Sequence, residues 1–228
     1  MSCFIHIETS TKVCSVALSK EKKILFYKEN QSGSSHAELL GVFVDDAFQY
    51  AKQNKLDVDA VSVSSGPGSY TGLRIGVSEA KGFCYGLEIP LIAIPSLSIM
   101  ASQVILSGED SDFYCPMIDA RRMEVYSAIY DKKFNQIREV SADIIDNDSY
   151  SEFLSKGKVC FFGDGAAKCK NVITSPNAVF MDNIYPTASG MVPIANEKYK
   201  QKEFVDIAYF EPFYLKEFMA TVAKNKII

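Results

Sequence analysis

The positions of apolar and polar residues predict a chain of short strands and amphipathic helices. Near the N-terminus, apolar residues alternate with polar ones or form short unbroken runs, a pattern that is typical of strands. Over residues 36–53 they recur every three to four positions, as in an amphipathic helix. Both patterns continue to residue 106 and give the order βββαβαβα. The predicted strands are 3–8, 14–19, 23–28, 59–64 and 89–94, and the predicted helices are 36–53, 71–86 and 96–106.

The same order of elements starts again after a polar segment. Residues 107–112 read Ser-Gly-Glu-Asp-Ser-Asp, which is typical of a loop and predicts a domain boundary. We therefore predict an N-terminal lobe, 1–108, and a smaller, degenerate C-terminal lobe, 109–228, each a mixed sheet with helices. Two successive units of this kind are the architecture of the actin, sugar-kinase and heat-shock-70 ATPase superfamily, an α/β fold. The predicted strands of the second unit are 114–120, 124–130, 134–140, 159–162 and 178–181, and its predicted helices are 150–154, 166–171 and 188–201.

Composition and charge limit the kinds of partner. Hydrophobic residues make up 47 % of the 228 residues and the net charge is −4, so the chain can bury a core but is a poor binder of nucleic acid on its own. No segment resembles a signal peptide or approaches the roughly 18 apolar residues of a membrane span. The six cysteines form no C-x-x-C pair and lie mostly in apolar segments, as buried thiols do. We expect a cytoplasmic protein with no membrane contact.

The two histidines exclude several hydrolase mechanisms. His6 lies inside the first predicted strand and is interpreted as a packed core residue. His36 follows Ser35 in an S-x-x-E capping box that ends at Glu38, and is interpreted as a first-turn helix residue. An H-E-x-x-H zinc site is impossible with these positions, and the sequence contains no G-x-S-x-G nucleophile elbow.

A glycine-rich segment joins the fourth strand to the second helix. Its glycines allow close approach of the backbone, and Ser69 or Thr71 can cap the helix, whose N-terminus could then hold an anion. A purely structural turn explains the segment equally well. The P-loop pattern fails because no Lys follows Gly72, and the Rossmann pattern fails because the next strand ends without an acid. The residues of this loop are Gly66, Pro67, Gly68, Ser69, Tyr70, Thr71, Gly72 and Arg74.

Several segments, in the same order along the chain, resemble the TsaB (YeaZ) family. Glu8 departs from the pattern, because many members have Asp there, at a strand end that faces the phosphates in nucleotide-binding relatives. The matching segments are I-E-T-S at 7–10, C-S-V-A-L at 14–18, H-A-E-L-L at 36–40, G-P-G-S-Y-T-G-L-R-I-G at 66–76, I-D-A-R-R-M-E-V-Y at 118–126, G-D-G-A at 163–166 and P-F-Y-L at 212–215.

The resemblance implies a helper subunit of a tRNA-modifying complex. TsaB proteins are similar to TsaD, the catalytic subunit that adds a threonylcarbamoyl group to the adenosine beside the anticodon of tRNAs that read ANN codons. TsaD holds its metal with an H-x-x-x-H, and Ser96 and Met100 stand at those two positions here, where neither replaces an imidazole. We therefore expect a non-catalytic chain that binds and activates TsaD. The complex would use ATP, the chain alone would need no cofactor, TsaE would be a further partner, and tRNA would bind only through the complex.

Two helices are predicted to form the partner surface. Gly72, Gly76, Ala80 and Cys84 lie four residues apart and share one helix face, where small side chains allow another helix to come close. Packing within their own lobe is the alternative. The helix 36–53 is apolar on more than one third of its circumference, and the family resemblance implies that TsaD, or a second copy of the chain when TsaD is absent, binds there. The expected partner-binding residues are Leu39, Phe43, Ala47, Tyr50, Gly72, Gly76 and Ala80.

A polar motif opens the second lobe. It contains Asp119, Arg121, Arg122 and Glu124 in a predicted strand turn, and either makes a contact across the cleft or to a partner, or is a solvated turn. The alternative function is a small-molecule kinase of the same superfamily, in which Glu8 and Asp119 would hold Mg²⁺. A metallopeptidase is not expected, because the sequence lacks the set of metal ligands that such an enzyme needs.

Overall fold

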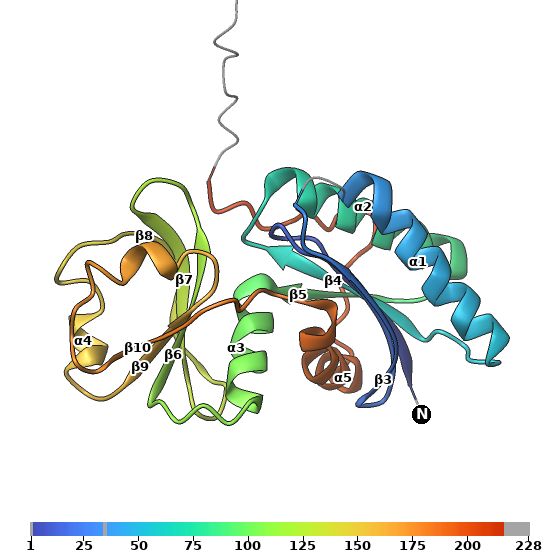
Figure 1. Ribbon diagram of the computed structural model, residues 1–228. Coiled ribbons are helices and arrows are strands. Elements are labelled where there is room, and N and C mark those ends of the chain that lie inside the picture. The colour runs from blue at the N-terminus through green and yellow to red at the C-terminus, as the bar shows by residue number, and fades with distance from the viewer. Residues whose placement is uncertain (1, 34–35, 217–228) are drawn as a thin grey trace, which may run out of the picture.

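The computed structural model describes residues 2–33 and 36–216, and these form two lobes, each built on a five-stranded mixed sheet (Figure 1). In the N-terminal sheet the strand order is β3-β2-β1-β4-β5, with β1, β4 and β5 parallel and β2 and β3 antiparallel to their neighbours. In the C-terminal sheet the order is β10-β9-β6-β7-β8. The two orders are the same topology used twice, which confirms the predicted fold class.

The elements occur in the predicted order, and most of their bounds lie within a few residues of the predicted ones. The strands are β1(Cys3–Glu8), β2(Cys14–Lys20), β3(Lys23–Asn30), β4(Ala60–Gly66), β5(Leu91–Pro95), β6(Phe113–Asp119), β7(Glu124–Asp131), β8(Gln136–Ile144), β9(Val159–Phe162) and β10(Ala178–Met181). The helices are α1(His36–Gln53), α2(Tyr70–Leu87), α3(Ser96–Leu106), α4(Ser151–Leu154), η1(Ala167–Cys169), η2(Ala188–Met191) and α5(Val192–Gln201). None of the helices in the described ranges is long and apolar enough to cross a bilayer.

The N-terminal sheet is covered on both faces. Strand β1 is buried along its whole length, as expected for a central strand between two layers of helices. On one face Ile5 and Ile7 pack with residues of α1 and α2. On the other face Phe4 packs with Ile99 of α3 and Ala195 of α5. Alternate residues of β1 therefore face two separate cores.

Helix α3 belongs to both lobes. Its Leu97, Met100 and Val104 pack against the C-terminal sheet, whereas Ile99 packs against the N-terminal sheet. The Ser98 hydroxyl also lies 2.9 Å from the hydroxyl of Tyr130 in β7. This explains why the predicted helix 96–106 is apolar nearly all round: it is a buried helix between two sheets.

The last elements return to the N-terminal lobe. Strands β6–β10 form the second lobe as predicted, but α5 lies against the N-terminal sheet, as Figure 1 shows. Val205 then pairs with Leu91 at the edge of β5. Residues after about 187, which the sequence assigned to the second lobe together with its strands, thus complete the core of the first.

Candidate functional site

Three of the motif segments meet at the N-terminus of α2. The loop between β4 and α2 lies between the β1–β2 loop on one side and a C-terminal segment, residues 205–216, on the other. The amide of Ser69 donates to the carbonyl of Ser10 at 2.7 Å, and the amide of Phe213 donates to the carbonyl of Ser65 at 2.7 Å. The glycine-rich loop is therefore held from both sides by the chain itself.

Close contacts explain two glycines of this loop. A Cβ on Gly68 would lie 2.2 Å from the Ser10 carbonyl oxygen. Gly66 has a φ of +102°, and a Cβ there would lie 2.5 Å from the Phe213 carbonyl oxygen. Only glycine allows the backbones to approach this closely.

Two amides at the start of α2 are bonded to the protein's own groups. Ser69, not Thr71, is the N-cap, and its hydroxyl accepts from the Gly72 amide at 3.2 Å. The carbonyl of Ser10 occupies the position from which an anion would have to reach the Ser69 amide. These contacts favour the structural turn, and anion binding at this loop stays a prediction.

The row of small residues on α2 faces its own lobe. A Cβ on Gly72 would lie 2.1 Å from the Thr9 carbonyl oxygen, and a Cβ on Gly76 would lie 2.3 Å from Thr9 Oγ1. Ala80 and Cys84, on the same face, are fully buried in the core under α1 and α2. The small side chains thus allow α2 to approach the β1–β2 loop, which is the alternative that the sequence left open.

The seven predicted partner-binding residues fall into two groups. Ala47, like the buried small residues of α2, is fully buried. Phe43 and Tyr50 are half-buried, as is Leu39, and they face the β3 edge: Phe43 lies 5.6 Å from the Lys28 amino group, and Tyr50 lies 5.8 Å from the ring of Phe26. Partner binding through these residues stays a prediction.

The outward surface of the two helices carries other residues. Val42, Tyr85 and Leu87 are 55, 82 and 49 % exposed. Gly82 and Gly86 lie beside them on α2, and nothing would lie within 4 Å of a Cβ on either. The sequence periodicity could not separate this face from the buried one, because apolar and small residues occur on both.

Glu8 is a buried carboxyl at the end of β1. Its Oε1 accepts from the Ser10 amide at 2.6 Å, and Oε2 has no hydrogen-bond partner among the described residues. Burial raises the pKa of Glu8 to about 7, although hydrogen bonds with Ser10 and Ser64 act in the opposite direction. A carboxyl that is enclosed and partly protonated at neutral pH is a poor ligand for Mg²⁺.

His6 is the packed imidazole that the sequence predicted. Its Nδ1 lies 2.6 Å from the Ser62 hydroxyl and its Nε2 lies 2.7 Å from the Ser19 hydroxyl. Burial lowers the pKa of His6 to about 3, so the ring is neutral. α1 begins at His36, as predicted, but Ser35 of the capping box lies outside the described residues.

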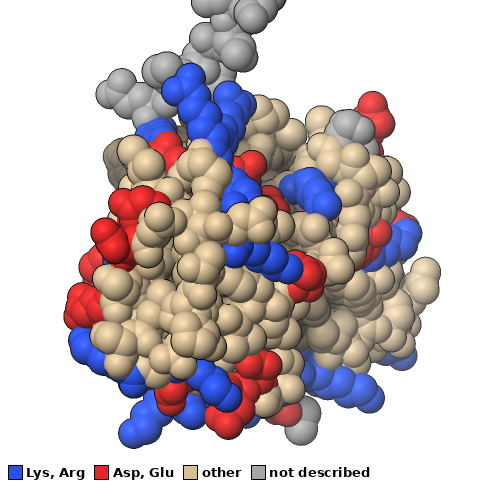
Figure 2. Space-filling model, turned by 60° about the vertical axis from the view of Figure 1, so that its left-hand side comes forward, with Lys and Arg blue, Asp and Glu red and all other residues tan. Residues whose placement is uncertain are grey.

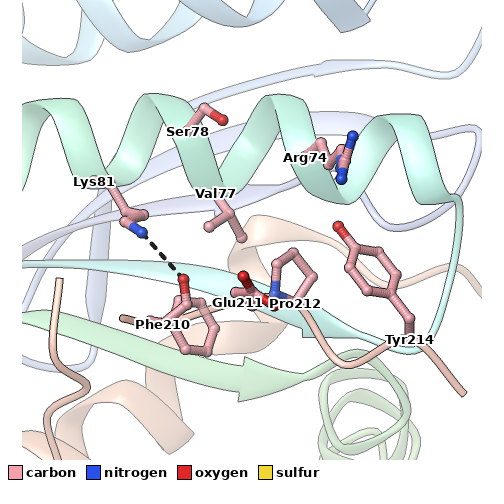
Figure 3. A pocket seen from close by; sticks show the side chains of 8 residues that line it. All are labelled: Arg74, Val77, Ser78, Lys81, Phe210, Glu211, Pro212 and Tyr214. Atoms are coloured by element: carbon pink, nitrogen blue, oxygen red, sulfur yellow. Dashed lines mark hydrogen bonds between the residues drawn. The ribbon is translucent and has the colours of Figure 1, made fainter. Parts of the chain in front are cut away.

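A cavity of about 340 Å³ lies between α2 and the C-terminal segment (Figure 3). Lys81 forms one wall and donates to the carbonyls of Ala208 and Phe210 at 3.3 and 3.1 Å. The residues that line the cavity are Arg74, Val77, Ser78, Lys81, Phe210, Glu211, Pro212 and Tyr214.

The aromatic end of this cavity explains the C-terminal motif. The Arg74 guanidinium lies over the Tyr70 ring at 4.4 Å, and the rings of Tyr70 and Tyr214 are 4.7 Å apart. In Figure 3 the Tyr214 hydroxyl points to Arg74, and this hydrogen bond raises the pKa of Arg74. The P-F-Y-L segment is therefore a clamp on α2, which the sequence did not indicate.

The second-lobe motif joins two segments that the sequence singled out separately. The Asp119 amide donates to Asp164 Oδ1 at 2.9 Å, which links the I-D-A-R and G-D-G-A segments. Burial raises the pKa of Asp164. Asp119 forms an ion pair with Lys168, and Glu124 forms one with Lys216 of the C-terminal segment. That segment therefore contacts both lobes.

The two positions that correspond to metal ligands in TsaD lie in the core. Ser96 and Met100 are both fully buried, and Met100 packs among the apolar residues of α3 and the C-terminal sheet. A hydroxyl and a thioether do not form a ligand set for a hard or borderline cation. Over 2–33 and 36–216, no group of three or more His, Cys, Asp or Glu could hold a metal ion.

Comparisons with known proteins identify the family. The family model described as "TsaD: tRNA N6-adenosine threonylcarbamoyltransferase" matches residues 30–224. The Escherichia coli protein named "tRNA threonylcarbamoyladenosine biosynthesis protein TsaB" is 29 % identical over 222 residues, which cover 95 % of each chain. The chain belongs to the TsaD/TsaB (YeaZ) family. Proteins with the same TsaB name in Haemophilus influenzae and Bacillus subtilis are 29 and 28 % identical over 93 % of this chain and 92 and 93 % of their own.

Solved structures agree on the fold. YeaZ from Pseudomonas aeruginosa superposes with a TM-score of 0.75 at 24 % identity, over 94 % of this chain and all of that chain. A second structure from the same organism, described as an uncharacterized protein with similarity to the peptidase YEAZ, gives 0.79 at 24 % identity over 95 % of this chain and all of its own. The TsaB (YeaZ) fold therefore extends over both lobes.

Proposed function

We propose that this chain is an accessory subunit in the synthesis of threonylcarbamoyladenosine in tRNA. It binds TsaD and activates it for threonylcarbamoyl transfer to the adenosine next to the anticodon of tRNAs that read ANN codons. The observation that carries the proposal is the match, over 93 to 95 % of the chain, to three proteins named for this pathway. The complex uses ATP and includes TsaE. The modification takes place in the cytoplasm, a reducing compartment that suits the six buried free thiols.

The residues at the former metal positions support a non-catalytic role. Ser96 and Met100 are both fully buried, and Met100 packs in an apolar cluster, so a metal there would require polar ligands beside that cluster. Catalysis then belongs to the partner, and this chain contributes binding surface.

The same geometry argues against the small-molecule kinase. That function needs acids that face the phosphates of a bound nucleotide. Glu8 is enclosed and has Oε1 bonded to the Ser10 amide, and the Asp119 carboxylate is paired with Lys168. The chain's own β1–β2 loop, through Ser10, fills the approach to the first turn of α2.

The outward face of α1 and α2 is the surface that we assign to TsaD, and to a second copy of the chain in a homodimer when TsaD is absent. Val42, Tyr85 and Leu87 present apolar area there, and Gly82 and Gly86 leave room for a partner helix.

Gel filtration with TsaD tests the proposal. The variant Val42→Glu/Tyr85→Glu changes only exposed side chains, so we expect an unchanged circular dichroism spectrum but loss of co-elution with TsaD. The matched control is Ile144→Glu, which changes an apolar side chain that is 77 % exposed on the C-terminal lobe and should leave the complex intact. Failure of the wild-type chain to co-elute with TsaD would refute the proposed function, and co-elution of the double variant would place the interface elsewhere.

A further inference from the structure

Two adjacent arginines form the tip of the β6–β7 hairpin. Arg121 and Arg122 have φ angles of +71° and +51°, in the left-handed region that glycine and asparagine adopt most easily. Non-glycine residues in this region are strained, and such strain is common at functional sites. Seven other non-glycine residues in the described ranges also have positive φ, so the angles mark a tight turn, and a role for the arginines depends on their side chains.

The turn is held without the guanidinium groups. The Glu124 amide donates to the Arg121 carbonyl at 3.2 Å, and the Ala120 amide donates to the Glu124 carbonyl at 3.1 Å. Asp119 Oδ1 accepts from the Arg121 amide at 3.0 Å. All these contacts use backbone atoms of the loop or the Asp119 carboxylate, so the two arginine side chains are free to serve another purpose.

The two carboxylates beside the turn are already neutralised. Asp119 is paired with Lys168, and Glu124 is paired with Lys216. Within 2–33 and 36–216, neither the Arg121 nor the Arg122 guanidinium has a hydrogen-bond or ion-pair partner, and both residues are exposed. Among the described residues, the tip therefore carries two positive charges that have no ion-pair partner. Figure 2 shows one face of the molecule, where blue side chains lie at the upper edge and others are interleaved with red ones along the left and lower edges.

The chemistry of the tip fits phosphate better than a protein surface. A guanidinium offers a planar fork of donors that matches phosphate oxygens. The exposed apolar side chains beside the tip are Met123, 37 % exposed, and Ile144, which lies opposite Glu124 and is 77 % exposed. Two single side chains give less apolar area than the centre of a protein interface needs. Interfaces with nucleic acid are more polar and positively charged.

We infer that the Arg121–Arg122 tip contacts the phosphate backbone of the tRNA that the complex binds. This inference rests on the proposed function. Two phosphate contacts on a chain of net charge −4 are too few to hold tRNA alone, so the contact adds to those of the partner.

The test uses the complex of the full chain with TsaD and an in vitro transcribed tRNA that reads ANN codons, with binding followed by fluorescence anisotropy at several salt concentrations. The variant Arg121→Asn/Arg122→Gly removes both guanidiniums and inserts residues that suit positive φ. We expect the Kd for tRNA to rise about tenfold, and the slope of log Kd against log salt concentration to fall by about two. The thermal midpoint should be equal to or above that of the wild type.

Two further variants separate the causes. Lys22→Gln/Lys23→Gln removes two charges at the exposed β2–β3 turn and should leave tRNA affinity unchanged. Arg121→Lys/Arg122→Lys keeps the charge without the fork, so it should restore the salt slope and part of the affinity.

Other outcomes would overturn the inference. An Arg121→Asn/Arg122→Gly variant that binds tRNA like the wild type would refute the inference. Loss of co-elution with TsaD would make the tip a protein contact, and a lower thermal midpoint would make it structural. If the wild-type chain forms no complex with TsaD, the proposed function fails and the inference fails with it, whereas an intact complex with unchanged tRNA affinity refutes the tRNA contact alone.

Discussion

The contact between Gly76 and Thr9 predicts a large difference between two glycines of the same helix. A Cβ on Gly76 would lie 2.3 Å from Thr9 Oγ1, whereas a Cβ on Gly82 would meet nothing within 4 Å. Thr9 is fully buried, and its hydroxyl donates to the Gly72 carbonyl at 2.8 Å. The Thr9 side chain therefore cannot turn away from a new methyl group without losing a buried hydrogen bond.

The magnitude follows from opposing effects. Alanine gains about 1 kcal/mol over glycine inside a helix. At Gly82 this gain stands alone, so Gly82→Ala should stabilise the chain by up to about 1 kcal/mol. At Gly76 overpacking costs about 1 to 3 kcal/mol, and the strained or broken Thr9 bond costs roughly 1 kcal/mol more. We expect Gly76→Ala to lower the free energy of unfolding by about 1 to 3 kcal/mol.

Urea unfolding followed by circular dichroism measures both variants. A third variant, Thr9→Ala/Gly76→Ala, removes the clashing hydroxyl and should be less destabilised than the sum of its two single changes by about 1 kcal/mol. If Gly76→Ala is as stable as Gly82→Ala, the row of small residues does not face the β1–β2 loop, and the reasoning about α2 is wrong.

Two predictions concern buried carboxyl groups. Burial raises the pKa of Glu8 to about 7, above its ordinary 4.5, so the folded chain binds the proton more tightly than the unfolded chain does. The fold therefore loses about 3 kcal/mol of stability as the pH rises from 4.5 to 7. Glu8→Gln should abolish this loss, and a variant with the wild-type pH profile in urea unfolding would contradict the prediction. At Asp143 burial raises the pKa, but hydrogen bonds from Arg138, Ser127 and Tyr150 outweigh it and lower the pKa to about 2, so this group stabilises the fold above pH 3.8 and the benefit is lost as the pH falls to 2. Asp143→Asn should remove the fall in stability between pH 3.8 and 2. It should also cost about 1 to 3 kcal/mol at pH 7, because Arg138 stays partly buried without its anion. Thermal unfolding between pH 2 and 7 measures both effects, and a variant that keeps the wild-type fall at acid pH would show that the ion pair contributes nothing.

The order of elements and the fold class could be predicted from the sequence because they depend on local patterns. The alternation at 3–8 predicted β1 and the helical periodicity at 36–53 predicted α1, and the structure shows both elements at those residues. The packed state of His6 followed from its place inside a central strand, and the structure adds the two serines that satisfy its ring.

Contacts between distant segments could not be predicted in this way. Periodicity showed that Gly72 and Gly76 share a face, but not that the face meets Thr9, which precedes Gly72 by 63 residues in the chain. It also gave no sign that α5 crosses to the N-terminal sheet, or that Phe213 pairs with Ser65. The C-terminal motif was visible as a match to a family, and its physical reason, the clamp on α2, appears only in the structure.

The central claim is that this chain activates a catalytic partner and does not itself catalyse the transfer. The direct test is threonylcarbamoylation of a purified ANN-decoding tRNA by TsaD and TsaE with ATP and an activated threonylcarbamoyl donor, measured with and without this chain, and with this chain alone. The account predicts modification only when TsaD and this chain are both present. Modification by the chain alone, or an equal yield in its absence, would contradict the account.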